Sequence, residues 1–318
     1  MELLDFGGYW KQIRMIKIIY NIVYAFFAIV IAFLALISCK NNKTEETILT
    51  GSTSILVDES VYPIAEDQVA VFESQYDAKI KLVPQSEKES VLSFVFNKAQ
   101  TIILTRKLNY KENNYFKNKK IKPLETPFAI DGIALIKNNK SKDTIQDISE
   151  IIDFLKGKPT KIKGLVFDNA NYSTTRALLE LAGLNNIPEN GVFSFKTNNE
   201  VIQYVSQNEG MIGVVGMNWI FQPTEEIKKA LENVTVLSVK NNTSNEYVYP
   251  SQENLANRKY PLARVLYIIN CQGYDGLGIG FASFMAGETG QRIILKSGLA
   301  PLREPSRNIR IRNKIENN

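Results

Sequence analysis

The stretch "STSILVDESVYPIAEDQVAVFESQY", residues 52–76, decides the fold. Its first six residues are rich in β-formers and stop at Asp58, which predicts a buried strand over 52–57. From residue 61 onward apolar side chains recur at helical spacing, which predicts a helix over 61–76. The polar corner "VDES" (57–60) joins the two elements, so the stretch reads as one strand–loop–helix unit.

The same alternation recurs along the chain. Strand patterns are found at 79–83, 101–104, 128–136, 162–167, 211–216 and 234–239, and helical patterns at 87–97, 110–118, 147–155, 199–207 and 277–295. Repeated βα units predict an α/β protein with a parallel or mixed sheet and helices on both faces. Ligands of such sheets bind at the carboxyl ends of the strands, where loops meet helix N-termini.

An uncharged run from Ile18 to Ile37, broken only by Asn21, precedes this part. Basic residues stand before the run, which is the layout of a secretory signal. The run is also long enough to span a bilayer, so an uncleaved membrane anchor is the alternative. Either way, the rest of the chain is expected outside the cytoplasm.

The run ends in "LISC", which resembles the signal of bacterial lipoproteins, with Cys39 as the lipidated residue and Met15 as a plausible start. Residues 1–39 would then be the signal peptide and residues 40–47 a polar tether. We expect a periplasmic or cell-envelope protein held to a membrane by its lipid. With Cys39 lipidated, Cys271 has no partner, so a disulfide framework is excluded.

Composition removes most enzyme classes. The chain has no histidine, which excludes Ser-His-Asp and Cys-His nucleophiles and histidine metal sites. Two cysteines cannot form a cysteine zinc site, and no GxxxxGK[ST] loop is present. The net charge of +5 is spread along the chain, which indicates solvated faces rather than a nucleic-acid surface. We therefore expect no enzyme, no cofactor and no nucleic-acid partner.

Four strand-to-helix corners are rich in polar groups, namely 57–60, 83–90, 104–108 and 168–176. The last corner, "DNANYSTTR", offers Ser173 or Thr174 as an N-cap and Arg176 in the first helical turn. A helix N-terminus with hydroxyls and a guanidinium is suited to binding an anion. Ordinary capping with a surface arginine is the alternative.

Several segments, in order, resemble the phosphate-binding proteins of bacterial ABC phosphate importers, in the lipoprotein form of the Bacteroidetes. They include "TIILTRKLNYKENNYFK", "FAIDGIALIKN", "VFDNANYSTTRALLE", "MIGVVGMNWI" and "YPLARVLYIIN…GLGIGFASFMAGETGQRIILKSGLAP". The resemblance implies a type 2 periplasmic-binding fold, with two α/β lobes, two crossover strands and a ligand cleft. Lobe 1 would comprise 48–127 and 246–310, and lobe 2 would comprise 128–245 with 128–136 as the outgoing crossover.

The resemblance also implies a set of ligand-binding residues: Asp58, Glu59, Ser60, Ser86, Thr105, Arg106, Asn171, Ser173, Thr174 and Arg176. Two departures affect the anion. The family's aspartate after the third strand is absent at Thr105 and Arg106, and its Ser-Gly-Thr helix start is replaced by Tyr172, Ser173 and Thr174.

Three further positions belong to the predicted cleft. Asp131 is kept from the family, with either a hinge role or ligand contact, and Asn218 and Trp219 would touch the ligand or close a strand. Asp58 or Glu59 is expected to accept the proton of bound phosphate and so to reject sulfate, while Arg106 and Arg176 balance the charge.

The function implied by the resemblance is a monomeric solute-binding lipoprotein that captures inorganic phosphate and delivers it to an ABC permease in the inner membrane. One alternative is the same fold binding another oxyanion or a phosphorylated ligand. The other is a structural surface lipoprotein that has lost the pocket.

Overall fold

The structure, a computed structural model, describes residues 15, 17, 19–30, 46–241 and 244–306. The chain divides into two compact units, Met1–Glu45 and Glu46–Asn318. In the first unit, residues 19–30 are helical and their side chains are exposed. Within the described ranges, no helix is both long and apolar enough to span a membrane. The predicted lipidation residue Cys39 and its cleavage site lie outside the described residues.

The second unit is built on one continuous mixed sheet with the strand order β2-β1-β3-β12-β4-β8-β6-β7. The strands are β1 (Gly51–Asp58), β2 (Ala78–Gln85), β3 (Thr101–Leu104), β4 (Leu124–Asn138), β6 (Gly164–Phe167), β7 (Val192–Ser194), β8 (Met211–Gly216) and β12 (Ala263–Asn270). Two further strands, β9 (Val234–Val236) and β13 (Ala300–Pro301), pair with β4. A separate small sheet joins β5 (Ile145–Gln146), β10 (Ser238–Lys240) and β11 (Tyr247–Val248).

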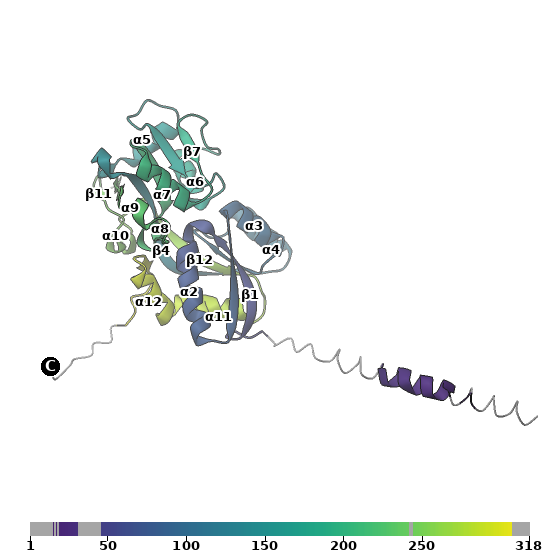
Figure 1. Ribbon diagram of the computed structural model, residues 1–318. Coiled ribbons are helices and arrows are strands. Elements are labelled where there is room, and N and C mark those ends of the chain that lie inside the picture. Colours follow the sequence, from purple (N-terminus) through teal and green to yellow (C-terminus); the bar gives the residue numbers. More distant parts are fainter. Residues whose placement is uncertain (1–14, 16, 18, 31–45, 242–243, 307–318) are drawn as a thin grey trace, which may run out of the picture. The chain divides into compact units, whose positions relative to one another are not determined.

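Helices lie in two groups, one on each part of the sheet (Figure 1). With β1–β3 lie α2 (Tyr62–Gln75), α3 (Glu87–Val95), α4 (Tyr110–Asn118), α11 (Leu277–Ala286) and α12 (Glu288–Lys296). With β6–β8 lie α5 (Ile148–Leu155), α6 (Ser173–Ala182), α7 (Asn198–Gln207), α8 (Met217–Phe221) and α9 (Lys228–Leu231). The short helix η1 (Glu59–Val61) leads from β1 into α2, whereas η2 (Asn139–Ser141) and α10 (Gln252–Ala256) connect strands.

Two long strands join the two parts, which we call the first and the second lobe. β4 pairs with β12 over residues 124–132 and then with β8 over residues 133–137. β12 in turn pairs with β3 of the first lobe. The two-lobed α/β architecture with crossover strands predicted from the sequence is confirmed. The exact lobe boundaries of 48–127, 246–310 and 128–245 stay predictions.

Each lobe is buried on both faces of its sheet. In β1, Ile55 and Val57 face the cluster that contains Phe72 and Phe281, while Leu56 faces a second cluster with Phe94. This arrangement explains why β1 reads as a continuous apolar run rather than an alternating one. The first lobe therefore has the helix–sheet–helix layering that the repeated βα pattern predicts.

One detail differs from the sequence prediction. The single strand expected over 234–239 is two strands, because Val234–Val236 pairs with β4 whereas Ser238–Lys240 pairs with β5 and β11. The strand β12 ends immediately before Cys271, where the sequence "YIINCQG" predicts a strand end with a half-buried free thiol, and Cys271 is indeed a free, half-buried cysteine.

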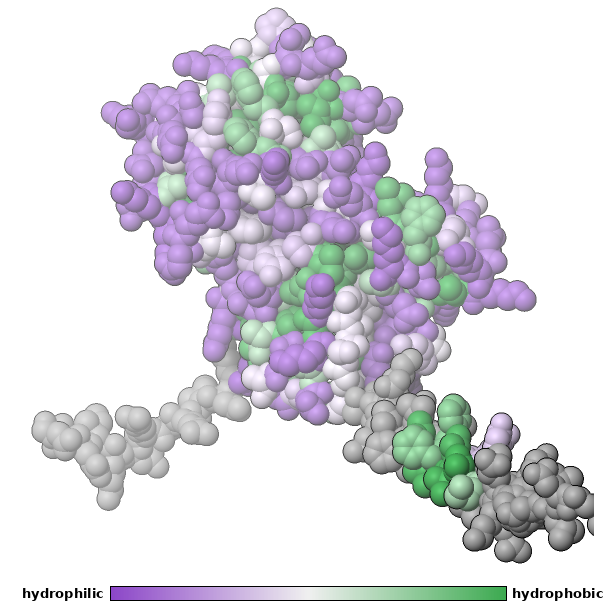
Figure 2. All heavy atoms as spheres, turned by 45° about the vertical axis from the view of Figure 1, so that its right-hand side comes forward, coloured by the Kyte–Doolittle hydropathy of each residue, from purple (hydrophilic) through white to green (hydrophobic). Residues whose placement is uncertain are grey.

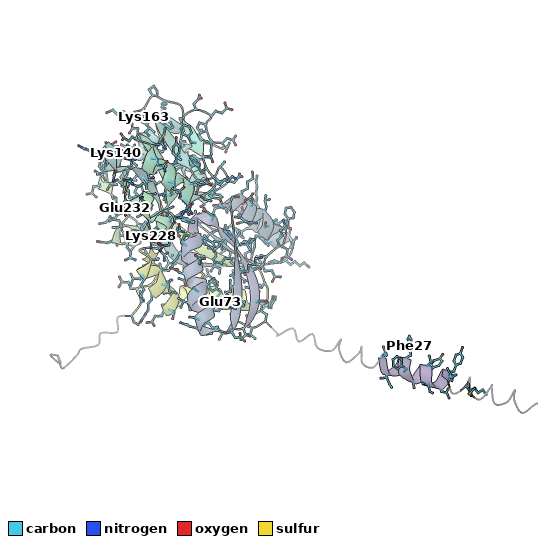
Figure 3. The ribbon with its side chains drawn as sticks, in the orientation of Figure 1. Phe27, Glu73, Lys140, Lys163, Lys228 and Glu232 are labelled. Atoms are coloured by element: carbon cyan, nitrogen blue, oxygen red, sulfur yellow. The ribbon has the colours of Figure 1, made fainter. Side chains whose placement is uncertain are left out.

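Charged side chains lie on the outside of both lobes. Lys140, Lys163, Lys228 and Glu232 extend from the second lobe, and Glu73 from the first (Figure 3). The face of the second unit seen in Figure 2 is mostly hydrophilic, with apolar side chains in scattered areas.

Gly280 is needed where α11 meets the start of the folded unit. A methyl group built on its Cα overlaps the backbone carbonyl of Ile48. Gly280→Ala is therefore expected to displace residues 46–50 or to lower the free energy of unfolding by about 1–3 kcal/mol. Urea unfolding measures this cost, and Ser283→Ala, an exposed position on the same helix, is the control. An unchanged midpoint for Gly280→Ala would show that this contact contributes nothing.

Candidate functional site

Three polar side chains from different elements converge where the lobes meet. Ser60 lies in η1 of the first lobe, Ser173 begins α6 of the second lobe, and Arg264 lies in β12. The Ser60 and Ser173 hydroxyl oxygens are 2.9 Å apart. Arg264 donates from Nη1 to Ser173 Oγ at 2.9 Å and from Nη2 to Ser60 Oγ at 3.2 Å. The guanidinium of Arg264 and two hydroxyl groups from opposite lobes thus lie within hydrogen-bond distance of one another.

Arg264 is held by the crossover strands themselves. It is the register partner of Asp131 in the antiparallel pair of β12 and β4. Its Nε and Nη2 donate to Asp131 Oδ2 at 3.0 and 2.7 Å. The two side chains are 8% and 0% exposed, so this is a buried, forked ion pair. Asp131 is thus paired within the crossover strands, and its two expected roles, at the hinge or in ligand contact, stay predictions.

The α6 N-terminus is open towards this cluster. Its N-cap is Tyr172, which makes no side-chain capping hydrogen bond. The expectation that Ser173 or Thr174 caps the helix is therefore wrong, because both already lie in its first turn. Ser173 instead bonds Ser60 and Arg264, and Thr174 Oγ1 donates to Asp168 Oδ1 at 2.7 Å. Uncapped first-turn N–H groups carry the partial positive charge that attracts anions.

The second lobe approaches the Ser60 turn closely. Asn218 donates from Nδ2 to the Ser60 carbonyl oxygen at 2.6 Å. A Cβ added to Gly216 would lie 2.5 Å from the same oxygen, so the approach needs a glycine there. Asn218 therefore joins the two lobes, while Trp219 beside it is buried at 6% exposure.

Four buried carboxyl groups surround the guanidinium: Asp58, Glu59, Asp131 and Asp168. Burial raises the pKa of Asp58, the charge of Glu87 raises it further, and Arg264 opposes both. Burial also raises the pKa of Asp131, against the opposing charge of Arg264. Burial, followed by the charge of Asp168, raises the pKa of Glu59 to about 8. Burial thus raises the pKa of all three groups, and Arg264 opposes this rise at Asp58 and Asp131.

Glu59 and Asp168 share one donor across the cleft. Asn198, at the start of α7, donates from Nδ2 to Glu59 Oε2 at 2.7 Å and to Asp168 Oδ2 at 3.1 Å. Its Oδ1 accepts the Gly216 N–H at 3.0 Å, which fixes the orientation of the amide. Burial raises the pKa of Asp168 to about 7, despite hydrogen bonds from Thr174 and the Asn169 N–H.

A second group of charges lies at a groove between α3 and α6. Arg176 Nε donates to both oxygens of Glu87, at 2.9 and 3.0 Å, and Arg106 Nε donates to Glu87 Oε1 at 2.7 Å. The groove has a volume of about 750 Å³, and Asn171 also lines it. Arg176 pairs with Glu180 as well, and Arg106 with Glu112. Both arginines are thus engaged by carboxylates.

Eight of the ten predicted ligand-binding residues fall into two sets. Asp58, Glu59, Ser60, Ser173 and Thr174 belong to the buried cluster described above. Arg106, Asn171 and Arg176 line the groove instead. Ser86 accepts a hydrogen bond from the Glu89 N–H and forms a capping box for α3. Thr105 is buried, and its hydroxyl has no hydrogen-bond partner among the described residues.

Three residues of the cluster were not among the predicted ligand-binding residues: Arg264, Asn198 and Asp168. The signal for Arg264 was its position as a lone charge within the apolar run "ARVLYIIN". Among the described residues, no group of three or more histidine, cysteine, aspartate or glutamate side chains is placed to hold a metal ion. The arrangement suits an anion, because a guanidinium, hydroxyls and helix N–H groups are all donors.

Comparison with known proteins gives the family. A family profile described as a PBP superfamily domain matches residues 42–289. No curated protein gives a significant match to the sequence.

Solved structures share the fold. One is a putative phosphate ABC transporter substrate-binding protein with bound phosphate from Clostridium perfringens, at 20% identity and a TM-score of 0.66, covering 80% of this chain and 100% of that chain. Another is an ABC-type phosphate transport receptor from Vibrio cholerae, at 16% identity and a TM-score of 0.61, covering 79% and 100%. A third is a possible phosphate binding protein from Planctomyces limnophilus, at 16% identity and a TM-score of 0.55, covering 80% and 94%. The chain belongs to the PBP superfamily.

Proposed function

We propose that this protein captures inorganic phosphate between its lobes and delivers it to an ABC permease. The observation that carries the proposal is the convergence of Ser60, Ser173 and Arg264 from two lobes and a crossover strand. An anion held by both hydroxyls and the guanidinium would bridge the lobes and stabilise the closed form. The structural relatives that are described as phosphate-binding support the choice of ligand.

The surrounding carboxyl groups favour phosphate over sulfate. Phosphate keeps a proton near neutral pH, whereas sulfate has none to donate. A buried carboxylate oxygen accepts a hydrogen bond from the phosphate proton but repels an unprotonated dianion. Asp58 is suited to this role, because its Oδ1 accepts the Ser60 N–H at 3.0 Å while its Oδ2 has no hydrogen-bond partner in the described chain. The nearby Ser173 hydroxyl makes its hydrogen bonds to Ser60 and Arg264.

The anchoring is proposed from the sequence. The "LISC" ending at Cys39 supports lipid attachment outside the cytoplasm, and the family is consistent with export. A monomer that meets the permease at the membrane would then pass on its ligand without an enzymatic step.

Calorimetric titration tests the ligand. The protein is freed of bound anion by partial unfolding and refolding, then titrated with phosphate and, separately, with sulfate. We expect phosphate to bind with a micromolar or lower dissociation constant, which is a binding free energy of at least about 8 kcal/mol in favour of the complex. Sulfate should give no heat of binding. Equal binding of both anions would exclude selection by a carboxylate. Binding of neither would favour a structural lipoprotein, and binding only of another oxyanion would favour the related binding function.

A further inference from the structure

Outside the direct anion contacts, the buried carboxyls of Glu59 and Asp168 are joined through one shared donor, the amide nitrogen of Asn198. The two carboxyls come from opposite lobes, are 8% and 0% exposed, and share the Asn198 amide nitrogen as donor. Asn198 cannot turn its amide around without losing its bond to the Gly216 N–H. Among the residues that the structure describes, no lysine or arginine side chain forms an ion pair with either carboxyl; the buried pair near Arg264 is made by Asp131.

Ionisation of both carboxyls in this buried site is energetically unfavourable. Two carboxylates that share a buried site raise each other's proton affinity, and one of them keeps a proton. Separating the lobes would move the two carboxyls apart. Glu59 would move with η1 of the first lobe, while Asp168 and Asn198 would stay with the second lobe. Each carboxyl would face water and ionise in its ordinary range, near about 4.

We propose that closure of the cleft takes up one proton, shared by Glu59 and Asp168, so that anion capture is proton-linked. The proton comes from solvent on closing and returns to solvent on opening. This inference deepens the proposed function and rests on it for the anion part, but closure itself can be followed without any anion.

Charged and polar groups from several elements surround the Glu59–Asp168 pair. Asp58 on the same turn raises the proton affinity of both carboxyls, and Arg264 lowers that of Asp168. Tyr172 donates its hydroxyl to the Lys196 carbonyl and so offers no hydrogen bond to the pair. Glu87, on α3, acts through Asp58.

The sign of the pH dependence follows. In the closed form the pKa values of Glu59 and Asp168 are about 8 and about 7, well above their ordinary range. The closed form therefore binds more protons than the open form between about pH 5 and 8. Closure is favoured at low pH, and this advantage is lost as the pH rises through about 8. Affinity for the anion is expected to fall by up to about tenfold per pH unit across this range.

The decisive variant is Glu59→Gln. Glutamine has the shape of the protonated glutamate, and its amide can donate to Asp168 in place of the shared proton. We expect Glu59→Gln to close at all pH values from 6 to 8.5 and to lose most of the pH dependence. Glu66→Gln is the matched control, since Glu66 is an exposed carboxyl on the adjoining helix. Asp168→Asn repeats the test if Glu59→Gln does not fold.

Two readouts separate the possible failures. The first is the fluorescence of Trp219, which lies in α8 against η1, measured without anion in a Trp10→Phe background so that it is the sole tryptophan. The second is phosphate titration in two buffers of different ionisation enthalpy, which counts protons taken up. The ionisation of phosphate itself is the same for wild type and variant, so the difference between them isolates Glu59.

We expect up to one proton taken up per phosphate near pH 7.5 in the wild type and in Glu66→Gln, and a clear loss in Glu59→Gln. Identical pH profiles and proton counts in wild type and Glu59→Gln would overturn the inference. A pH-dependent Trp219 signal without any phosphate heat would support proton-linked closure and overturn the proposed ligand.

Discussion

Replacing Arg264 with alanine is expected to weaken phosphate binding by at least about 100-fold and to lower the free energy of unfolding by about 3–5 kcal/mol. The first effect follows because charge-assisted hydrogen bonds to an anion contribute about 1.5–3 kcal/mol each. The second follows because Asp131, which is 0% exposed, loses its forked partner and becomes an uncompensated buried carboxyl. Phosphate titration and urea unfolding measure the two effects separately.

A double substitution tests the cause of the stability loss. Asp131→Asn removes the charge that Arg264→Ala would leave unpaired, so the double variant should recover part of the lost stability but none of the anion affinity. Arg292→Ala is the control, because its ion pair with Glu288 is exposed and such surface pairs add little to stability. Normal phosphate affinity in a folded Arg264→Ala variant would remove Arg264 from the binding site.

Replacing Arg176 with alanine is expected to speed the release of phosphate by about tenfold while leaving the rate of binding nearly unchanged. Arg176 reaches Glu87 of the first lobe from α6 of the second, so separating the lobes would break this ion pair. Glu87 is 4% exposed on its side chain and Arg176 is 27% exposed, so screening is only partial. Radiolabelled phosphate, chased with excess unlabelled anion, gives the release rate.

Two variants separate the interlobe pair from its neighbours. Glu180→Gln removes the exposed partner of Arg176 within α6 and should leave release unchanged. Arg106→Ala removes a partner of Glu87 from its own lobe and should lower stability more than it changes release. A release rate for Arg176→Ala equal to that of Glu180→Gln would show that the Glu87 pair does not hold the cleft closed.

The strands and helices of the first lobe follow from local patterns. The apolar run from Ile55 to Val57 and the helical spacing of apolar residues after Val61 both reflect burial against neighbouring layers. Burial of this kind is visible in the sequence as the spacing of apolar residues. The break between β9 and β10 has no such signal, because residues 234–239 form one apolar run whose halves pair with different sheets. Partner choice among strands is set by tertiary contacts, which lie far apart in the sequence.

The site was predictable where it lies on a loop before a helix. Asp58, Glu59, Ser60 and Ser173 lie in the polar loops 57–60 and 168–176 that the sequence pattern singled out, and their role in binding stays a prediction. Arg264 lies within a strand, and its role depends on the register of β12 with β4. Arg106 and Arg176 were predicted to balance charge in the cleft. Both bond to Glu87, which lies 19 residues from Arg106 and 89 residues from Arg176 in the sequence.

The shared strand β4 has a consequence for how the chain acquires its structure. The strands that pair with β4 are synthesised long after it: β8 ends at residue 216, β12 at residue 270 and β13 at residue 301. The central strand therefore cannot complete its pairings while the chain is still emerging from a ribosome, and loop closure over more than a hundred residues is slow. The predicted first lobe is assembled from two separate parts of the chain, so it cannot be completed until residues after 246 have been synthesised. Pulse-labelling hydrogen exchange would detect this as nearly simultaneous protection of β3, β4 and β12.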